Sequence, residues 1–466
     1  MGHQNDVNPS GERVYPFAPS GNAGAPRPRG PVAVVGLGKI GLPLAIQYVR
    51  KGRRVIGCDI NLQVIETINA GRSHVQEEAG LDDAVASAVA QGLLTATQDT
   101  TSAVSQAEVV VVIVPVLVDE AHAVDFSAID AATRAVGAGL TPGTLVVYET
   151  TLPVGTTATR FGPLLEQASG LLAGRDFWLA YSPERVSSGS IFRDLASYPK
   201  IVGGINYAST EAVTAFYRSV LDATIMPMRS ADDAEFVKLI ETTYRDVNIA
   251  LANEFACFAD LRGLDVAQAT AAANTQPYSH IHAPGVGVGG HCIPVYPYFL
   301  MQHTEEGLLL PRAARLINDG MATYAVQRIE TEIGQLARRS VLILGVAYRG
   351  DVRELAYTST KLLRDAFEAR GASVFIDDPL FSAEELRTLG YAPLTDEQRG
   401  RINAIVLQAG HRAYQHLDWS RFPECRIVLD GRRALQREVI EARGMRYICI
   451  GDGMLADTPA RAEGGV

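Results

Sequence analysis

Cysteine is scarce in this sequence. Five cysteines, at positions 58, 257, 292, 425 and 449, are scattered over 466 residues without a Cys-x-x-Cys pair. An odd, widely spaced set argues against a disulfide framework and favours a reducing compartment, so we expect a cytoplasmic protein.

Long apolar runs and an excess of positive charge are also missing. The longest apolar run, VVVVIVPVLV at 109–118, contains a proline and is far shorter than the ~20 residues that span a bilayer. The formal net charge is −10, whereas non-specific nucleic-acid binding requires basic surfaces. We therefore expect no membrane span and no nucleic-acid partner. The remaining composition, 47% hydrophobic and 20% charged, is typical of a globular protein with several cores.

Short apolar runs alternate with helical stretches from residue 31 onward. Strands covered on both faces carry such runs, and the alternation predicts a parallel, doubly wound sheet. We expect strands at 32–36, 53–59, 109–114, 144–150, 177–182 and 200–204. A second α/β pattern predicts strands at 340–348, 373–378, 404–408 and 426–430.

A long helix separates these two patterns. Residues 231–263 carry apolar residues at three- and four-residue steps without a proline or glycine before Gly263, and further helices follow at about 311–337. Such a helix commonly joins two lobes or packs against a symmetry mate, so we expect a homodimer. The predicted fold class is α/β, with two Rossmann-like doubly wound domains joined by a long central helix and a helical middle domain.

The stretch GLGKIG follows the first predicted strand and opens a helix. Its glycines, Gly36, Gly38 and Gly41, allow a tight turn, a close approach to a pyrophosphate and close helix–sheet packing. Asp59 ends the second strand, where a carboxylate accepts from a ribose 2′-hydroxyl and repels a 2′-phosphate. The sequence therefore predicts dinucleotide binding, with NAD preferred over NADP.

The glycine-rich stretch GVGVGGHCIPVYPYFL at 285–300 contains Cys292. Three interpretations compete: a nucleophilic thiolate, a merely structural cysteine, and a metal site with His280, His282 and His291. His291 and Cys292 are adjacent, which suits a tetrahedral metal site poorly, so we expect no metal. A nucleophilic cysteine beside NAD can trap an aldehyde as a thiohemiacetal and carry it through a thioester to an acid.

Several stretches together resemble the UDP-glucose/GDP-mannose 6-dehydrogenase family, and more narrowly its branch acting on UDP-N-acetylhexosamines (GlcNAc or ManNAc). The resemblance covers about residues 31 to 452 and includes the cysteine motif, VAVVGLGKIGLPLA, YETTLPVGTT, YSPERVSSGS, FVKLIETTYRDVNIALANEFA, LILGVAYRGDVRE and VLDGRR. It implies an NAD-binding Rossmann domain over 31–220, a central helical and dimerisation domain with the catalytic cysteine loop over 221–337, and a UDP-sugar-binding α/β domain over 338–454. The Pro/Gly/Asn-rich residues 1–30 and residues 455–466 are predicted to be tails.

The resemblance also implies roles for individual residues. Cys292 would be the thioester nucleophile, Lys238 would stabilise charge on the reacting oxygen, and Thr151 and Glu184 would hold or activate water. The implied cofactor-binding residues are Gly36, Leu37, Gly38, Lys39, Ile40, Gly41, Asp59, Val114, Pro115 and Thr151. The implied substrate-binding residues are Arg185, Arg245, Asn248, Gly287, Gly289, His291, Arg349, Arg353 and Arg432.

Four positions depart from the family pattern. Tyr296 stands where the family has Asp four residues after the cysteine, and Thr242 stands where it has Asn four residues after the lysine. Both positions lie in the implied catalytic set. The usual V-P-T-P reads V-P-V-L at 114–117, and the segment after GVAY is shorter.

The implied reaction is a four-electron, NAD-dependent oxidation at C6 of UDP-GlcNAc or UDP-ManNAc to the uronic acid, for polysaccharide or secondary-metabolite biosynthesis. Alternatives are a two-electron dehydrogenase with an altered product, oxidation of UDP-glucose or GDP-mannose, and a non-catalytic protein that binds nucleotide sugars.

Overall fold

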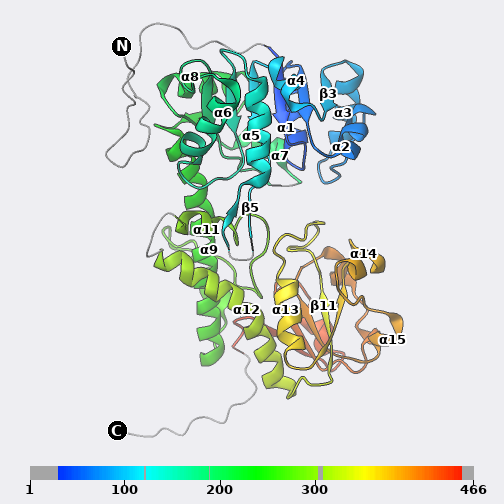
Figure 1. Ribbon diagram of the computed structural model, residues 1–466. Helices are drawn as coiled ribbons and strands as arrows, with labels where there is room; N and C mark the ends of the chain where they lie inside the picture. Colours follow the sequence, from blue (N-terminus) through cyan, green and yellow to red (C-terminus); the bar gives the residue numbers. More distant parts are fainter. Residues whose placement is uncertain (1–29, 120–121, 188, 303–307, 454–466) are drawn as a thin grey trace, which may run out of the picture. The chain divides into compact units, whose positions relative to one another are not determined.

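The computed structural model describes residues 30–119, 122–187, 189–302 and 308–453. Apart from Gly30, the predicted tails at 1–30 and 455–466 lie outside the described residues. The chain forms two compact units, Met1–Glu241 with Tyr298–Gln302, and Thr242–Pro297 with His303–Val466. The boundary falls inside the long helix α9 (Ala231–Arg262), which the sequence predicted over 231–263 (Figure 1).

The first unit is built on an eight-stranded sheet with the order β10-β9-β8-β7-β4-β1-β2-β3. Its strands are β1 (Val32–Val35), β2 (Val55–Cys58), β3 (Leu94–Thr97), β4 (Val109–Val112), β7 (Leu145–Tyr148), β8 (Trp178–Tyr181), β9 (Lys200–Gly204) and β10 (Ile225–Pro227). From β3 to β8 the order is the 3-2-1-4-5-6 arrangement of dinucleotide-binding folds. Within the described residues β8–β9 is the one antiparallel pair of this sheet, a departure from the all-parallel sheet that the apolar runs predicted.

Helices cover both faces of this sheet. Those of the first unit are α1 (Gly41–Arg50), α2 (Leu62–Asn69), α3 (Leu81–Ala90), α4 (Thr100–Ser105), α5 (Ser127–Gly139), the π-helix η1 (Thr157–Phe161), α6 (Gly162–Ser169), α7 (Ile191–Ser197) and α8 (Tyr207–Val220). Residues of α1, α3, α7 and α8 share one apolar cluster with alternate strand residues such as Val32 and Val34. Helices α4, α5 and α6 lie side by side over the other face (Figure 1). A short hairpin, β5 (Leu117–Val118) and β6 (Val124–Asp125), extends beyond β4.

The second unit contains a five-stranded, fully parallel sheet with the order β12-β11-β13-β14-β15. Its strands are β11 (Ser340–Leu344), β12 (Ser373–Asp377), β13 (Ile402–Leu407), β14 (Ile427–Asp430) and β15 (Arg446–Cys449). The order corresponds to 2-1-3-4-5, the other common doubly wound arrangement, with its switch point between β11 and β13. The two doubly wound sheets confirm the predicted fold class.

The remaining helices surround this second sheet or precede it. They are α10 (Val266–Ala273), α11 (Tyr296–Met301), α12 (Leu309–Ile333), α13 (Ser359–Glu368), α14 (Ala383–Thr388), α15 (Asp396–Arg399), α16 (Arg437–Glu441) and the 3₁₀ turns η2 (Arg412–His416) and η3 (Trp419–Arg421). Helix α11 continues across the boundary between the two units.

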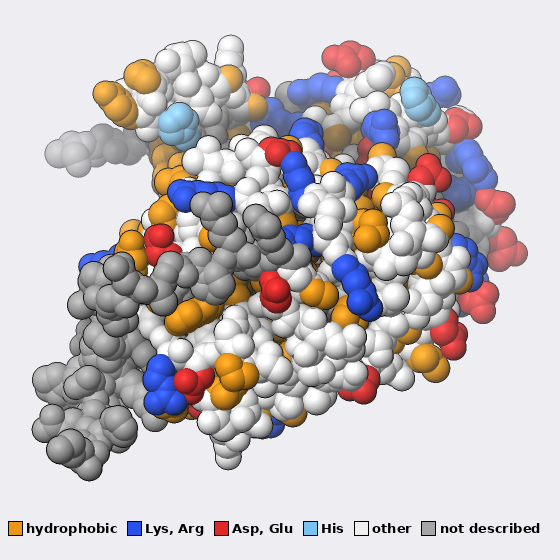
Figure 2. All heavy atoms as spheres, turned by 90° about the horizontal axis from the view of Figure 1, so that it is seen from above, with side chains coloured by type: hydrophobic (Ala, Val, Ile, Leu, Met, Phe, Trp, Pro, Cys, Tyr) orange, Lys and Arg blue, Asp and Glu red, His pale blue; other side chains and the backbone are white. Residues whose placement is uncertain are grey.

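Two surface properties bear on the classes of partner. In the part of the chain that the structure describes, no helix is both long enough and apolar enough to cross a membrane. On the face drawn in Figure 2, Lys and Arg side chains lie among Asp and Glu side chains, so both signs of charge are mixed there.

Candidate functional site

The glycine loop between β1 and α1 has the geometry of a phosphate-binding turn. Gly36 has φ +98°, and a Cβ on Gly41 would lie 1.9 Å from the carbonyl oxygen of Gly36, so neither position accepts a side chain. A Cβ on Gly38 would have no described atom within 4 Å, which leaves room for a ligand against the backbone. Helix α1 begins without a side-chain cap. Leu42 N and Leu44 N donate to the carbonyls of Gly38 and Ile40, so the positive end of the helix dipole, together with the open backbone at Gly38, is what favours an anion here.

Asp59, directly after β2, connects this loop to the strand. Its Oδ2 accepts from Leu37 N (2.9 Å), and its Oδ1 accepts from Asn61 N (2.9 Å). Beside it, Ile60 is 93% exposed. Lys39 pairs with Glu77 at 3.0 Å, whereas Leu37 is fully buried and serves packing through its side chain. The carboxylate stands at the position predicted from the sequence, at the carboxyl edge of the sheet.

The neighbouring parallel strands bring further predicted residues to the same edge. Val114 and Pro115 follow β4, Thr151 follows β7 and Glu184 follows β8. Thr150 Oγ1 donates to the Val114 carbonyl (2.5 Å), which fastens the β7 loop to the end of β4. Thr151 itself is buried.

The β7 loop is anchored from α9 by Glu235. This fully buried carboxylate accepts from Gly155 N (2.5 Å), Thr157 N (2.9 Å) and Thr157 Oγ1 (2.6 Å). Burial raises the pKa of Glu235 to about 8, against the hydrogen bonds from Thr157 and Gly155 that lower it. The loop that carries Thr151 is therefore fixed at both ends.

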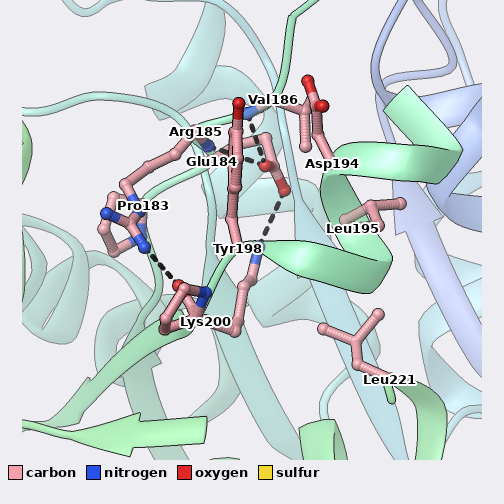
Figure 3. Close-up of a pocket in the computed structure, with 10 residues that line it drawn as sticks. Pro183, Glu184, Arg185, Val186, Asp194, Leu195, Tyr198, Lys200 and Leu221 are labelled. Carbon is pink, nitrogen blue, oxygen red and sulfur yellow. Dashed lines mark hydrogen bonds and ion pairs between the residues drawn. The ribbon is translucent and has the colours of Figure 1, made fainter. Parts of the chain in front are cut away.

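A buried ionic cluster lies beside the Glu184 turn. Lys200 Nζ donates to Glu184 Oε2 (2.7 Å) and to Glu149 Oε2 (2.9 Å), and Glu149 Oε1 also accepts from the hydroxyls of Tyr48 and Tyr217. Glu184 Oε1 accepts from Arg185 N and Val186 N. Figure 3 shows the Glu184 carboxylate held between these two N–H groups and the Lys200 ammonium.

The pKa values of the two carboxylates of this cluster are shifted in opposite directions. Burial raises the pKa of Glu149 to about 6, although the Lys200 charge lowers it. Burial also raises the pKa of Glu184, but the Lys200 charge and the hydrogen bonds outweigh burial and hold this pKa below its usual value. Glu184 is therefore an anion whose oxygens already accept three hydrogen bonds, which makes it a weak base in this geometry.

Lys238 contacts this turn from α9, and Arg185, a residue of the turn, connects it to its surroundings. Lys238 Nζ donates to the backbone carbonyl of Glu184 (2.7 Å). The Arg185 guanidinium donates to the Pro199 carbonyl and lies 3.7 Å from Glu241 Oε1. In the first unit the structure thus gathers the glycine loop, Asp59, Val114, Pro115, Thr151, Glu184 and Lys238 around the carboxyl ends of β1, β2, β4, β7 and β8.

The cysteine loop belongs to the second unit and packs against residues 348–359 of that unit. Gly290 N donates to the Ala356 carbonyl (2.8 Å), and His291 Nε2 lies 3.4 Å from Glu354 Oε1. A Cβ on Gly289 would lie 2.8 Å from Tyr348 Cβ, and one on Gly287 would lie 2.5 Å from Ser359 Oγ. The glycines are needed here for close packing of the loop.

Cys292 itself ends this loop. Its carbonyl accepts from Tyr296 N (3.0 Å) at the start of α11, and its side chain is partly exposed. Cys58, Cys425 and Cys449 are buried, and burial raises the pKa of each thiol to about 12. These three thiols stay protonated at neutral pH, so they are not candidate nucleophiles.

Asn248 and Arg245 lie on the part of α9 in the second unit. The Asn248 amide donates to the His280 carbonyl (2.9 Å) and accepts from His282 N (2.9 Å), so the side chain holds the chain before the cysteine loop. Arg245 is exposed and lies close enough to His282 to lower its pKa, an effect smaller than that of burial. Among the described residues, no three His, Cys, Asp or Glu side chains are grouped to hold a metal ion.

The three predicted arginines of the second sheet differ in environment. Arg432 Nε donates to the Gln408 carbonyl (2.7 Å), and its Nη2 donates to the Gly287 carbonyl (3.4 Å), which ties the cysteine loop to the switch point of the sheet. Arg353 donates to Leu380 O and pairs with Glu385, away from this point. Arg349 is exposed and donates to its neighbour Tyr348 Oη (3.0 Å).

Sequence reasoning missed Glu149, Lys200 and Glu235. The available signal for the first two was a charged residue at the end of an otherwise apolar strand, as in LVVYE and KIVGG. A charge in such a strand is buried and therefore requires a partner.

Comparison with known proteins identifies the family of this chain. Models of the UDP-glucose/GDP-mannose dehydrogenase family match residues 31–221 (NAD binding domain), 232–320 (central domain) and 342–437 (UDP binding domain). The UDP-N-acetyl-D-mannosamine dehydrogenase of Pyrococcus horikoshii is 35% identical over 87% of this chain and 96% of its own. The NDP-N-acetyl-D-galactosaminuronic acid dehydrogenase of Ralstonia nicotianae is 33% identical over 86% and 95%.

A solved structure resembles the whole described chain. The UDP-D-ManNAc dehydrogenase structure from Pyrococcus horikoshii matches with a TM-score of 0.82 at 32% identity, over 91% of this chain and 99% of that one. The chain belongs to the UDP-glucose/GDP-mannose dehydrogenase family and is an NAD-dependent nucleotide-sugar dehydrogenase.

Proposed function

We propose that this enzyme oxidises the C6 hydroxyl of a UDP-N-acetylhexosamine, UDP-ManNAc or UDP-GlcNAc, to the carboxylate in two steps through Cys292. The observation that carries the proposal is the partly exposed Cys292 in a glycine loop that packs on residues 348–359 of the second sheet's domain. Relatives named for UDP-N-acetyl-D-mannosamine and NDP-N-acetyl-D-galactosaminuronic acid support the N-acetylhexosamine.

The cofactor fits the edge of the first sheet. The open backbone at Gly38, the uncapped start of α1 and the Asp59 carboxylate suit a pyrophosphate and a ribose. When bound, NAD supplies the acceptor for one hydride in each of the two oxidations. The strand-end carboxylate favours a free 2′-hydroxyl over a 2′-phosphate.

The chain's own residues supply the remaining chemistry. We assign to Lys238 the stabilisation of negative charge on the C6 oxygen, because its ammonium is positioned by the Glu184 carbonyl in the turn after β8 and carries three N–H donors. The Cys292 thiolate adds to the C6 aldehyde, and the oxygen takes up a proton to give a thiohemiacetal. Loss of a hydride and a proton gives the thioester, and water then cleaves the C–S bond to give the acid and the free thiol.

Thr151 and Glu184 are assigned to the positioning of water near C6, and Tyr296 and Thr242 to the same surroundings. Thr151 is buried beside the cofactor edge, whereas the Glu184 carboxylate accepts three hydrogen bonds from the protein. We therefore assign to Glu184 an electrostatic and positioning role ahead of proton removal.

The nucleotide end of the substrate is assigned to the switch point of the second sheet. There, among the described residues, the buried atoms Gln408 Oε1 and Ser359 Oγ have no hydrogen-bond partner, as expected of a site that completes its hydrogen bonds with a ligand. Arg432 lies at the same place, and Arg349 and Arg353 stand in the segment that follows β11, one of the two strands at the switch point. An arginine is suited to a diphosphate because its planar fork binds two oxygens.

A homodimer through α9 and a cytoplasmic location complete the proposal. In the second unit α9 exposes the apolar residues Tyr244, Leu251, Phe255 and Phe258, whose spacing of seven, four and three residues places them on one helix face. The five cysteines form no disulfide, which supports a reducing compartment.

A panel of nucleotide sugars with NAD tests the reaction. We expect two NADH per molecule of UDP-ManNAc or UDP-GlcNAc, measured at 340 nm, and a uronic acid by mass. Cys292→Ser should abolish the acid, whereas Cys257→Ser, a partly exposed cysteine of α9, should leave it unchanged. One NADH per sugar with an active Cys292→Ser variant would establish the two-electron alternative. Turnover of UDP-glucose or GDP-mannose alone would reassign the substrate, and binding without turnover would contradict the proposal.

A further inference from the structure

Within the buried cluster, Lys200 and Glu149 have no part in the chemistry described so far, whereas Glu184 is assigned to the positioning of water. Because β9 runs antiparallel to β8, the first residue of β9 lies opposite the turn that follows β8. Lys200 is that first residue, and its side chain is 5% exposed. Its ammonium reaches Glu184 Oε2 at 2.7 Å from the interior of the first unit.

The same turn is held by a second cation. The Arg185 guanidinium donates to the Pro199 carbonyl, so two neighbouring residues of the turn bind two neighbouring residues at the start of β9 (Figure 3). The carboxylate of Glu184 faces Lys200, and its carbonyl faces Lys238 at 2.7 Å. Rotation of this one residue therefore moves the acceptor of Lys238.

We propose that Lys200 is a positioning residue of the oxidation: by binding the Glu184 carboxylate, it fixes the turn whose carbonyl orients the Lys238 ammonium. The inference rests on the proposed role of Lys238 and adds to it a residue that touches neither substrate nor cofactor. Glu149 in turn fixes Lys200, because Lys200 Nζ also donates to Glu149 Oε2 at 2.9 Å.

Charge explains why a lysine occupies this position. Glu149 and Glu184 are both largely buried, and one cation shared between them offsets part of the desolvation of the two carboxylates. Without Lys200 the Glu184 carboxylate loses its nearest cation and keeps the N–H groups of its own turn, next to a second buried carboxylate, Glu149. We then expect it to turn toward solvent or to take up a proton, and either change releases the carbonyl that holds Lys238.

The first test compares Lys200→Met with Lys51→Met, which removes a lysine from an exposed ion pair with Asp222 in the same unit. We expect Lys200→Met to lower kcat by about 10- to 100-fold, the usual effect of a misplacement near 1 Å. The KM for NAD should stay within about two-fold, because the cofactor loop is untouched. Lys51→Met should leave kcat and thermal unfolding unchanged.

The pH profile provides a readout that a merely structural role would not change. The charged groups around Glu184 are Lys200 on β9, which binds its carboxylate, and Lys238 on α9, which binds its carbonyl. Glu149 after β7 and Asp194 on α7 lie nearby. Loss of the Lys200 charge removes the nearest cation, so the acid limb of the kcat profile should move to higher pH. An acid limb that stays in place together with an unchanged kcat overturns the proposal.

A double-mutant cycle with Lys238→Met separates positioning from an independent effect. If Lys200 acts through Lys238, the double variant Lys200→Met/Lys238→Met should have a kcat less than about three-fold below that of Lys238→Met alone. If the two residues act independently, the two losses of kcat multiply. A multiplicative loss overturns the proposal. If Lys238→Met keeps full activity, the role given to Lys238 under the proposed function is wrong instead.

A second variant serves as the control for loss of folding. If Lys200→Met does not fold, the pair Lys200→Met/Glu149→Met replaces the buried ion pair with apolar side chains, which proteins often tolerate. This variant should show a normal unfolding transition and a normal dissociation constant for NAD, yet the same loss of kcat. A folded double variant with wild-type kcat overturns the proposal. If the wild type makes no uronic acid, the same comparisons are made on the two-electron oxidation of the sugar that it accepts.

Discussion

Glu149→Gln should change how the stability of the first unit depends on pH. Burial of Glu149 raises its pKa from its ordinary 4.5 to about 6. The folded protein therefore binds this proton more tightly than the unfolded chain does, and the free energy of unfolding falls as pH rises from about 4.5 to about 6. At about 1.4 kcal/mol per pH unit, this interval corresponds to a loss of about 2 kcal/mol.

Glutamine suits the same position. Its amide oxygen can accept from Lys200, and its NH₂ group can donate to the hydroxyl oxygens of Tyr48 and Tyr217, which now donate to Glu149. The variant should fold, and it removes the titration while keeping the volume of the side chain. Relative to the wild type, Glu149→Gln should gain about 1.5 kcal/mol between pH 4.5 and pH 6.5, because the Glu149 carboxyl of the unfolded chain is already half deprotonated at pH 4.5.

Urea unfolding followed by tryptophan fluorescence can measure this difference. The sequence has two tryptophans, Trp178 in β8 of the first unit and Trp419 in the second. A Trp419→Phe background therefore reports the first unit alone. Glu397→Gln, at an exposed carboxylate of α15, serves as the control. If the difference between Glu149→Gln and the wild type is the same at pH 4.5 and pH 6.5, the reasoning about the buried cluster is refuted.

Three further predictions concern the cofactor, the dimer and the second sheet. Asp59→Ala removes the acceptor of Leu37 N and should raise the KM for NAD by about 10-fold. It should also lower the preference for NAD over NADP, measured as the ratio of kcat/KM for the two cofactors. Phe258→Asp on α9 should give a monomer in sedimentation, whereas Leu389→Asp, another exposed apolar site, should not. Asp430→Ala leaves three N–H groups and the Tyr447 hydroxyl without their acceptor and should lower the free energy of unfolding of the second unit by about 3 to 5 kcal/mol, followed by Trp419 fluorescence.

The central strands and the long helix could be predicted because their signals are local. Strand β9 begins and ends where the sequence predicted, and β4 (Val109–Val112) lies inside the predicted 109–114. Strands β3 and β15, at the ends of their sheets, were missed. An edge strand is partly exposed, as the mixed burial of β3 illustrates, and its residues then lack the apolar run that identifies a central strand.

The ionic cluster could not be predicted, because its members meet only in the folded chain. Glu149 and Lys200 are 51 residues apart, and Glu235 is 78 residues from Thr157. Each looks like an ordinary charged residue in its own sequence window. By contrast, the glycine loop and Asp59 belong to one strand–helix–strand unit with a fixed spacing, so their roles can be predicted from a short stretch of sequence. The division into three domains and the roles of the individual site residues stay predictions.

The turn after the first strand has the same geometry in both sheets, but the segments that follow it differ, and this difference supports the arginines proposed for the second sheet. Gly36 after β1 and Gly345 after β11 have nearly the same φ, +98° and +97°. In both, a carboxylate after the next strand accepts from the chain beyond the glycine: Asp59 from Leu37 N, and Asp378 from Val346 N and Ala347 N. In the first unit α1 begins five residues after the glycine, whereas α13 begins only at Ser359. The second turn therefore has no helix N-terminus directly behind it, which is why we assign the diphosphate proposed for this edge to side-chain cations such as Arg432.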